Sequence, residues 1–535
     1  MAAGLLRASA VMASGTIVSR LLGLAKMMLL AYAIGSISSV SGDAFSLGNE
    51  LANSIYYLVL GGMLNAVLVP QIVRAAKDPD GGSGYINKLL TLVSVALTGM
   101  TAIAVAAAPF IVFINAPSWS GEKLALATAF AFWCMPQVLF FGLYVVLGEV
   151  LNARSVFGPS TWAPVANNVI GIAGLFVFIA LFGADPDGTR TPIDWTPVSI
   201  AVLAGSATLG VAVQAFILYI PWRMTGLRYR PDFKWRGMGL GRTVKIAAWS
   251  LAAITVVQLA TIATNTVITR ASGEGVSVAG LQNAMMIFLM PHSVLAVSLA
   301  TAYFTRLAQA GQSGRMPEFR ADYSASMRSI LTVMMLAAIV LVVVAPYIGR
   351  VLYFDASPEL VEQFSPVLQA YLLSLVAFSC FFVTQRAFYA LSDTRTPFFI
   401  VVAQQSLLVT LALCVPTVFG VPGPYIGLGF ALSWSAAEIF GALLSATLLR
   451  RKIGSIDGRR ILVCLGRAFG GALVAAAAGL GAVALLRSVV PAPGVGEALL
   501  FGVLVAGLVG AVYLGALAAM RSPELSLLLA RLRRR

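Results

Sequence analysis

The chain has 535 residues, of which 59% are hydrophobic and 11% are charged, less than half of the roughly 25% charged residues of soluble domains. This composition excludes a soluble enzyme and a disordered chain, and it predicts an all-α polytopic membrane protein. The apolar residues come in runs of 20 or more, which argues against the short alternating strands of a membrane β-barrel. The net charge of +15 then raises the question of which side of the membrane carries it.

Fourteen apolar segments follow one another along the chain, separated by polar or Pro/Gly-rich breaks, and each has about the 20 residues that a membrane-spanning helix needs. They run approximately 8–36, 44–75, 85–115, 122–152, 159–183, 196–222, 243–270, 276–309, 324–348, 360–391, 397–419, 424–449, 463–488 and 496–520. The first is interrupted by Arg20 and Lys26 and shows no small-residue cleavage site. It is therefore expected to be a retained helix and not a signal peptide.

The basic residues are distributed unevenly between the loops. With fourteen spans both termini lie on one side, and that side carries 29 of the 36 Lys and Arg residues, against five on the other side and two within the first span. Because cytoplasmic loops are enriched in Lys and Arg, this distribution predicts fourteen spans with both termini in the cytoplasm. The basic loops are expected to contact anionic membrane lipids, and no nucleic-acid partner is expected.

Two short loop motifs indicate an internal duplication. VLNARSVFGP (150–159) joins the fourth and fifth spans, and ALSDTRTP (390–397) joins the tenth and eleventh. This spacing predicts two parallel six-helix repeats, residues 1–224 as an N-lobe and 225–450 as a C-lobe, with the substrate path between them. Residues 451–535 add two further helices and a basic tail. Chance similarity of the two motifs is the alternative.

Two basic residues within the first span are costly in a membrane. An Arg or Lys at the centre of a spanning helix costs about 2.5–3.5 kcal/mol on insertion scales and normally faces a cavity or a partner. Arg20 and Lys26 are six residues apart, which places them about 9 Å apart along the helix and about 120° around it. A substrate cavity is one interpretation. Snorkelling of Lys26, or pairing with an acid such as Glu50, is the other.

The second span carries further polar side chains. Asn49, Glu50 and Asn53 share one face by their spacing and are candidates for substrate binding, with helix-to-helix hydrogen bonding as the alternative. Candidates for gating or structural roles are Asp43, Gly61, Gly62, Pro291, Arg154 and Arg395. No catalytic residue, metal site or cofactor is expected, because no nucleophile motif or cluster of His, Cys and carboxylates is present. The four cysteines are expected to be buried thiols.

Several stretches in a fixed order point to a known family. They are SRLLGLAK (19–26), DAF (43–45) before LGN (47–49), VP (69–70), LNARSVFGPSTWAPVANN (151–168), SLATAYFTRL (298–307) and FYALSDTRTP (388–397). In order and spacing they resemble the MurJ (MviN) lipid II flippases of the multidrug/oligosaccharidyl-lipid/polysaccharide exporter superfamily. The resemblance covers nearly the whole chain, including the two extra helices.

This resemblance implies a function. It implies a transporter in the bacterial cytoplasmic membrane that moves lipid II, the undecaprenyl-pyrophosphate-linked peptidoglycan precursor, to the outer leaflet by alternating access. Arg20 matches the first of the family's cavity arginines, and Lys26 stands where an Arg is usual. Two further family arginines are not matched, one falling near Tyr56 and one near Met286.

Three alternatives remain open at the level of sequence. One is a flippase of the same superfamily for another lipid-linked polysaccharide. Another is a multidrug/cation antiporter, which would depend on intramembrane acids such as Glu50 and Glu438. The third is a membrane scaffold that recruits cell-wall synthesis proteins through its basic face.

Overall fold

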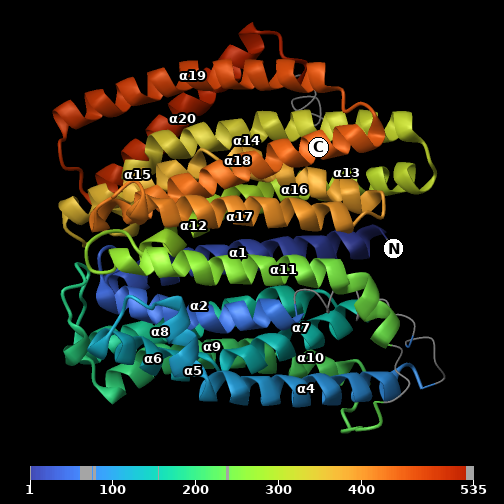
Figure 1. Ribbon diagram of the computed structural model, residues 1–535, viewed down its shortest axis with the longest axis vertical. Coiled ribbons are helices and arrows are strands. Elements are labelled where there is room, and N and C mark those ends of the chain that lie inside the picture. The colour runs from blue at the N-terminus through green and yellow to red at the C-terminus, as the bar shows by residue number, and fades with distance from the viewer. Residues whose placement is uncertain (1, 61–74, 76–79, 155, 236–239, 526–535) are drawn as a thin grey trace. The chain divides into compact units, whose positions relative to one another are not determined.

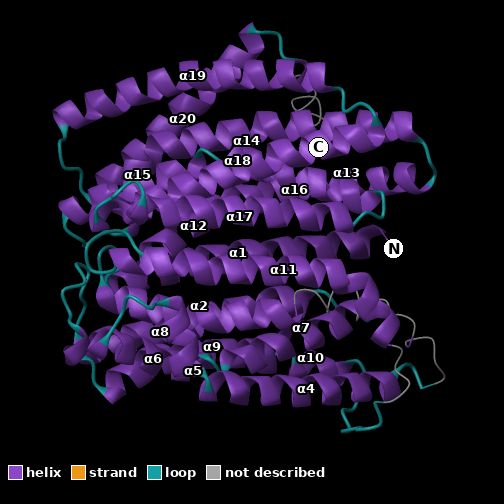
Figure 2. Cartoon of the chain, in the orientation of Figure 1, coloured by secondary structure: helices purple, strands orange, loops and turns teal. Residues whose placement is uncertain are grey.

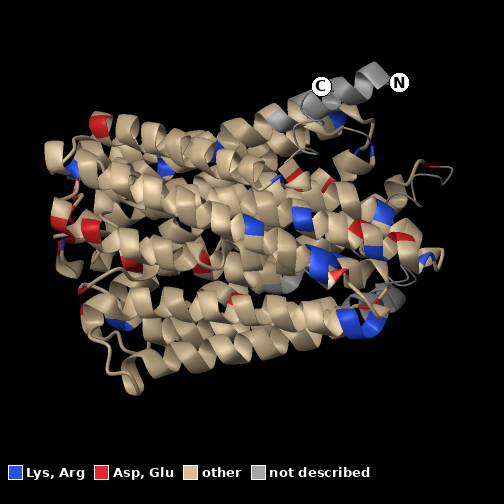
Figure 3. Ribbon diagram, turned by 90° about the horizontal axis from the view of Figure 1, so that it is seen from above, with Lys and Arg blue, Asp and Glu red and all other residues tan. Residues whose placement is uncertain are grey.

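A computed structural model describes residues 2–60, 75, 80–154, 156–235 and 240–525. These residues form helices joined by loops and contain no strand (Figures 1 and 2). Thirteen of the helical stretches in this part are long and apolar enough to cross a membrane. The charged residues lie mostly near helix ends and in loops (Figure 3). The predicted all-α polytopic membrane fold is therefore confirmed.

The contacts between residues divide the chain into two compact units, Met1–Gly273 and Glu274–Arg535. Within each unit the long helices lie side by side (Figure 1). Unit 1 contains α1 (Ala2–Ile34), α2 (Val40–Leu60), α4 (Ser83–Ala106), α5 (Ala108–Asn115), α6 (Gly121–Cys134), α7 (Gln137–Ala153), α8 (Gly158–Phe182), α9 (Pro197–Phe216), α10 (Tyr219–Met224) and α11 (Leu240–Ile268). Unit 2 contains α12 (Val278–Pro291), α13 (Val297–Gln312), α14 (Met316–Leu352), α15 (Pro358–Leu372), α16 (Leu375–Ala390), α17 (Arg395–Thr417), α18 (Ile426–Ile453), α19 (Gly458–Val489) and α20 (Val495–Ala519).

The second predicted span is the exception to the count of thirteen. Its described part is α2, which is helical as predicted but is too polar to be recognised as a span by hydropathy alone. The rest of this segment, including Gly61 and Gly62, lies outside the described residues. The polar residues of α2 are offset by contacts within unit 1, where α2 packs on α6 and the ring of Phe45 meets that of Phe130 edge-on at 5.5 Å.

A crossing of two loops holds the first two helices of unit 1. Gly35, with a φ of 70°, lies so close to Gly188 that a Cβ on Gly35 would come within 2.7 Å of the Gly188 Cα. Beside this crossing the indole of Trp195 donates a hydrogen bond of 2.8 Å to Ser41 Oγ. Only glycine tolerates both the left-handed backbone and the close approach, so the end of α1 and the start of α2 are fixed against the loop after α8.

Helix α11 belongs to unit 1 by its contacts. Gln258 Nε2 donates to the carbonyl of Ser54 on α2 at 2.8 Å, and Asn265 Nδ2 donates to Asn115 Oδ1 on α5 at 2.9 Å. The compact unit therefore ends at Gly273, whereas the duplication in the sequence predicts a repeat boundary after residue 224. Contacts report packing and not ancestry, so the repeat boundary stays a prediction.

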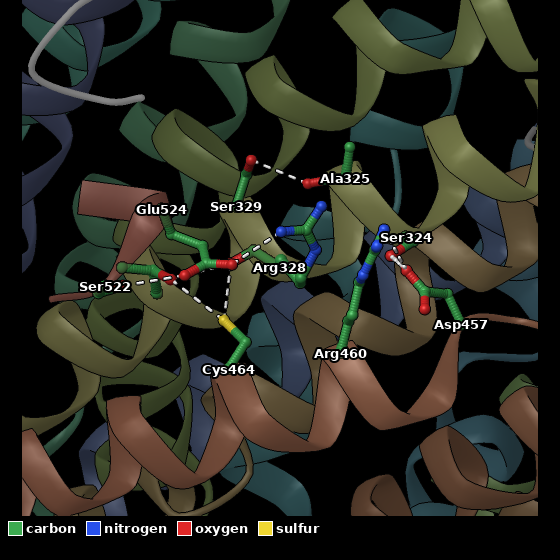
Figure 4. A network of polar contacts seen from close by, with 10 residues as sticks. Ser324, Ala325, Arg328, Ser329, Asp457, Arg460, Cys464, Ser522 and Glu524 are labelled. Atoms are coloured by element: carbon green, nitrogen blue, oxygen red, sulfur yellow. Dashed lines mark hydrogen bonds and ion pairs between the residues drawn. The ribbon is translucent and has the colours of Figure 1, made fainter. Parts of the chain in front are cut away.

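The two additional helices pack on α14 within unit 2. Their apolar contact includes Val343 of α14, Ala475 of α19 and Val509 of α20, each no more than 2% exposed. A polar network closes one end of this contact: Arg328 pairs with Glu524 at 2.8 Å, and Ser324 donates to Asp457 Oδ2 at 2.8 Å (Figure 4).

A π-helical turn follows Pro291, one of the candidates for a gating or structural role. Pro291 ends α12, and residues His292–Ala296 form one turn of π-helix before α13 begins. His292 Nδ1 lies 3.0 Å from Ser379 Oγ of α16, and its ring meets that of Phe378 edge-on at 4.5 Å. A proline cannot donate the helical hydrogen bond, and the wider turn accommodates this loss.

Candidate functional site

Lys26 lies inside unit 1, on the side of α1 that packs against α8. A Cβ added to Gly171 of α8 would come within 2.8 Å of Lys26 Nζ, so the ammonium end of the side chain occupies the space that this glycine leaves. The thiol of Cys134, at the end of α6, is close enough to interact with it electrostatically. Three helices, α1, α6 and α8, therefore surround the lysine.

The ammonium group of Lys26 has no partner in the described part of the chain. No hydrogen-bond acceptor or carboxylate lies within bonding distance of it there, although the side chain is only partly exposed. The predicted alternative that Lys26 pairs with Glu50 is therefore not what the structure shows. A cation that is mostly removed from solvent and unpaired is costly, and it is the arrangement that favours an incoming anion.

The turn of α1 that carries Arg20 is also fastened to α8. Asn168 Nδ2 donates a hydrogen bond of 2.8 Å to the carbonyl oxygen of Ser19, the residue before Arg20. Arg20 itself is half-buried. Arg20 and Lys26 lie on different faces of α1. The hydrogen bond from Asn168 and the close packing at Gly171 together fix the rotation of α1 about its axis. They therefore fix the directions in which both basic side chains leave the helix. Whether both contact the substrate stays a prediction.

Asn49 takes part in hydrogen bonds between helices. Its side-chain oxygen accepts a hydrogen bond of 3.1 Å from Gln137 Nε2 of α7, which also donates to Thr208 Oγ1 of α9 at 3.0 Å. Thr208 in turn donates to the carbonyl of Trp133 on α6 at 2.7 Å. Four helices are thereby linked through one buried glutamine. For Asn49 the structure thus shows the interhelical contact that the sequence left as the alternative to substrate binding.

Glu50 and Asn53 are brought together one turn apart on α2. Their side chains form a hydrogen bond, and Tyr57 lies on the same stretch of helix, close enough to Glu50 to interact with its charge. Glu50 and Asn53 are partly buried. Of the three residues predicted to share a face, Asn49 thus bonds to a neighbouring helix, whereas Glu50 and Asn53 bond to each other.

The remaining candidates have local contacts. Asp43 is 1% exposed in the first turn of α2. Arg154, which follows α7, donates to the carbonyl of Gly81 and holds the loop before α4. In unit 2 the guanidinium of Arg395 lies 5.7 Å from the centre of the Phe399 ring, and Pro291 precedes the π-helical turn. Their described contacts lie in loops and near helix ends, and their gating or structural roles stay predictions.

The two positions without the family's arginines are filled by other contacts. Tyr56 packs its ring against Phe141 of α7 at 5.5 Å and against Tyr57 at 5.3 Å. Met286 is half-buried on α12. Among the described residues no group of three His, Cys, Asp or Glu side chains comes together to hold a metal.

Two further residues shape this site, and only one of them carries a signal in the sequence. Asn168 is an amide within an apolar segment, which predicts a hydrogen bond between helices, and it does link α8 to α1. Gly171 carried no signal of its own in a chain with 50 glycines. Its role follows from its position one turn after Asn168 on α8, opposite Lys26, which only the packing of α1 on α8 reveals.

Comparison with known proteins identifies one family to which most of the chain is similar. A family model described as "Lipid II flippase MurJ" matches residues 30–504. The "Probable lipid II flippase MurJ" of Rhizobium tropici is 27% identical over 393 residues, which cover 71% of this chain and 70% of that protein. The protein of the same name from Buchnera aphidicola is 26% identical over 461 residues, covering 83% of each chain.

Solved structures agree on the fold. The structure titled "Lipid II flippase MurJ, inward closed conformation" matches with a TM-score of 0.71 at 18% identity, over 94% of this chain and 97% of that one. An inward-facing multidrug resistance MATE family transporter of the MOP superfamily matches with a TM-score of 0.65 at 16% identity, over 82% of this chain and 96% of that one. At these identities the likeness is one of fold.

Proposed function

Because this chain belongs to the MurJ family of lipid II flippases, we propose that it translocates lipid II from the cytoplasmic to the outer leaflet of the bacterial cytoplasmic membrane. The substrate would be a polyprenyl pyrophosphate carrying a muropeptide, and the protein would act as a transporter rather than as a catalyst. The observation that carries the proposal to a site is the unpaired ammonium of Lys26 in its slot at Gly171.

Lys26 suits a pyrophosphate for physical reasons. A phosphate oxygen is an anionic acceptor, and hydrogen bonds between two charged groups are about twice as strong as neutral ones. Arg20 adds a second cation on α1, about 9 Å along the helix and about 120° around it. Two cations at this separation suit an extended anionic headgroup better than a single small anion. Glu50 and Asn53 supply the acceptors and donors that an amide-rich muropeptide requires.

Alternating access fits the division of the chain. Each of the two units has its own dense internal contacts, so each can move as a body without repacking its helices. The proposal includes the orientation drawn from the sequence, with both termini and the basic loops in the cytoplasm. Anionic membrane lipids would contact those loops, and cell-wall synthesis proteins are candidate partners.

The test is a depletion and complementation experiment in cells that have no other lipid II flippase. We expect wild type to restore lipid II to the outer leaflet and Lys26→Ala to lower the rate by roughly 10- to 100-fold, the value of a lost charge-assisted contact. Lys26→Arg keeps the charge and should retain most of the activity. The measurement is the fraction of lipid II accessible to an outer-leaflet probe, at matched expression of each variant.

Two results would contradict the proposal at different levels. Unchanged outer-leaflet lipid II on depletion of the protein would sink lipid II as the substrate. Normal rates in Lys26→Ala, with lipid II transport otherwise established, would remove Lys26 from the site while leaving the substrate in place.

A second candidate function, a cation-coupled exporter, is favoured by one observation in unit 2. Glu438 of α18 is 4% exposed, and its Oε2 has no hydrogen-bond partner in the described structure, while Gln404 of α17 bonds to the carboxyl group. A buried carboxyl group with a spare oxygen is suited to exchanging a proton or cation. If Glu50→Gln together with Glu438→Gln leaves transport unchanged, this alternative fails.

A further inference from the structure

A large apolar groove lies within unit 2, between the core helices of this unit and α19. It has a volume of about 1360 Å³ and is lined mainly by α14, α16, α18, α19 and the loop 454–457. We call it the α19 groove. Small-molecule sites usually have about 300–1,000 Å³, so this groove is larger than most of them. Its walls are mainly aliphatic, for example Leu331, Val376, Leu443 and Leu473.

The mouth of the α19 groove is basic. Arg450, near the end of α18, and Arg459, at the start of α19, both line it and both are exposed. The only acid among the lining residues is Asp457, which accepts a hydrogen bond from Ser324 and forms an ion pair of 3.7 Å with Arg460 (Figure 4). Its charge is therefore already matched, and the mouth keeps an excess of positive charge.

The basic residues around this loop differ in their partners. Three that do not line the groove are paired: Lys452 pairs with Asp393, Arg328 pairs with Glu524, and Arg320 donates to the carbonyl of Ile453. Arg450 and Arg459, the two that line the groove, have no hydrogen-bond or ion-pair partner in the described part of the chain. Unmatched positive charge therefore lies where the apolar walls end.

An aliphatic groove ending in two free guanidinium groups at a loop between two membrane-spanning helices matches an amphipathic anion. Within a membrane, hydrocarbon gains little by leaving bulk lipid for an apolar groove, so acyl chains alone would exchange freely. Residence at this place then depends on the headgroup. Guanidinium binds phosphate through charge-assisted, bidentate hydrogen bonds. A zwitterionic lipid carries its own cation beside the phosphate and an anionic lipid does not, so the two guanidinium groups favour the anionic lipid.

We propose that the α19 groove binds one anionic glycerophospholipid, with its acyl chains along α14, α16, α18 and α19 and its phosphate on Arg450 and Arg459. The bound lipid fills the space between the helices of unit 2 that precede residue 454 and α19, which follows it. It acts as a structural component of the joint, and this role does not depend on the identity of the transported substrate.

Native mass spectrometry of the full chain tests this proposal. The protein is titrated with 1-palmitoyl-2-oleoyl phosphatidylglycerol or with the phosphatidylcholine of the same chains. We expect one phosphatidylglycerol to be retained with a preference of about tenfold over phosphatidylcholine. In Arg450→Gln with Arg459→Gln the preference should fall to about one. A matched control, Arg451→Gln with Arg467→Gln, removes the same charge from residues that do not line the groove and should keep the preference.

A second variant separates the groove from the headgroup site. Ala446→Phe fills part of the apolar wall without changing charge, and it should lower retention of both lipids by a similar factor. The proposal is overturned if the preference survives in Arg450→Gln with Arg459→Gln, if the control loses it equally, or if Ala446→Phe leaves both lipids bound as in wild type. It is also overturned if the mass retained at this stoichiometry is a polyprenyl pyrophosphate and not a glycerophospholipid.

Discussion

Lys26 and Gly171 are structurally coupled, because the lysine side chain occupies the space that the glycine leaves open. We predict that Gly171→Val displaces the ammonium group and lowers lipid II translocation about as much as Lys26→Ala does. Since both changes would remove the same interaction, their effects should not add in the double variant. The measurement is the initial rate of lipid II appearance in the outer leaflet for the two single variants and the double variant.

The control for this cycle is Ala173→Val, on the same helix at an exposed position. It places the same valine side chain on the same helix, away from Lys26, and should leave the rate unchanged. If Gly171→Val and Lys26→Ala reduce the rate independently, so that the double variant loses the product of both factors, the two residues do not act as one unit.

Some residues of the candidate site could be predicted from the sequence and others could not. Arg20 and Lys26 could be identified from the sequence because a charge inside an apolar run carries a cost that demands an explanation. Asn49 could be placed within a span, but its contact with Gln137 could not, because the partner of an amide depends on which helices are neighbours. Gly171 could not be identified at all, since an absent side chain leaves no chemical signal.

A carboxylate outside the membrane-spanning helices supplies a pH prediction. Burial by itself raises the pKa of Asp393, but hydrogen bonds from Lys452 and Thr396 outweigh it and hold the pKa of the carboxyl group below its ordinary value. Thr396 donates both its backbone N–H, at 2.9 Å, and its hydroxyl, at 2.7 Å, so Asp393 holds the first turn of α17. We predict that Asp393→Asn lowers the free energy of unfolding by about 1–2 kcal/mol at pH 7.

The sign of the pH dependence follows from linkage. Because the folded pKa of Asp393 lies below the unfolded one, its contribution is complete above the unfolded pKa and is lost as the pH falls through the folded value. The difference in thermal stability between wild type and Asp393→Asn should therefore narrow as the pH falls below the ordinary carboxyl pKa of about 3.9. A difference that is constant below this pH would show that the carboxylate charge is not what stabilises the loop.

At the level of helices, the attachment of α19 depends on one glycine. A Cβ on Gly479 would come within 2.4 Å of Val509 Cγ2 on α20 and 2.8 Å of Val343 Cγ1 on α14. We predict that Gly479→Val destabilises this three-helix contact by about 1–3 kcal/mol through overpacking. The check is the midpoint of thermal unfolding of the purified protein in detergent.

The same helix offers a matched control. Gly481 has no atom within 4 Å of the position that its Cβ would take, so Gly481→Val should change the midpoint little. Equal loss in both variants would mean that valine in α19 is unfavourable by itself and that the contact among α14, α19 and α20 is not tightly packed.

The helices themselves were largely readable from the sequence, and their grouping was not. Apolar length defines a span, so the segments were expected. The π-helical turn after Pro291 was not, because a proline within a span does not specify the kind of turn that follows it. The packing of α11 with the rest of unit 1 includes two hydrogen bonds, from Gln258 to the backbone carbonyl of Ser54 and from Asn265 to the side chain of Asn115. Such pairs are matched in space and not in sequence, which is why the predicted repeat boundary and the observed edge of the compact unit fall at different residues.

At the scale of the whole molecule, the open question is which ends of the spans face the cytoplasm. The fold confirms a multi-pass membrane protein, and the number of spans determines that loops alternate between sides. The excess of Lys and Arg in alternate loops predicts that the loop between α13 and α14 is cytoplasmic and that the loop between α19 and α20 is outside. Labelling of single cysteines introduced in these loops distinguishes the two orientations.

The chain is well suited to that experiment because its four native cysteines are free and either buried or partly buried. We predict that Ala492→Cys, in the loop before α20, reacts with a membrane-impermeant maleimide added to whole cells. Ser313→Cys, in the exposed turn after α13, should react only after the membrane is permeabilised. The reverse pattern would invert the whole protein in the membrane, and it would place the basic mouth of the α19 groove at the outer leaflet. Labelling of both cysteines in intact cells would show that one segment between them does not span, because the two positions are separated by an odd number of spans in the fourteen-span arrangement.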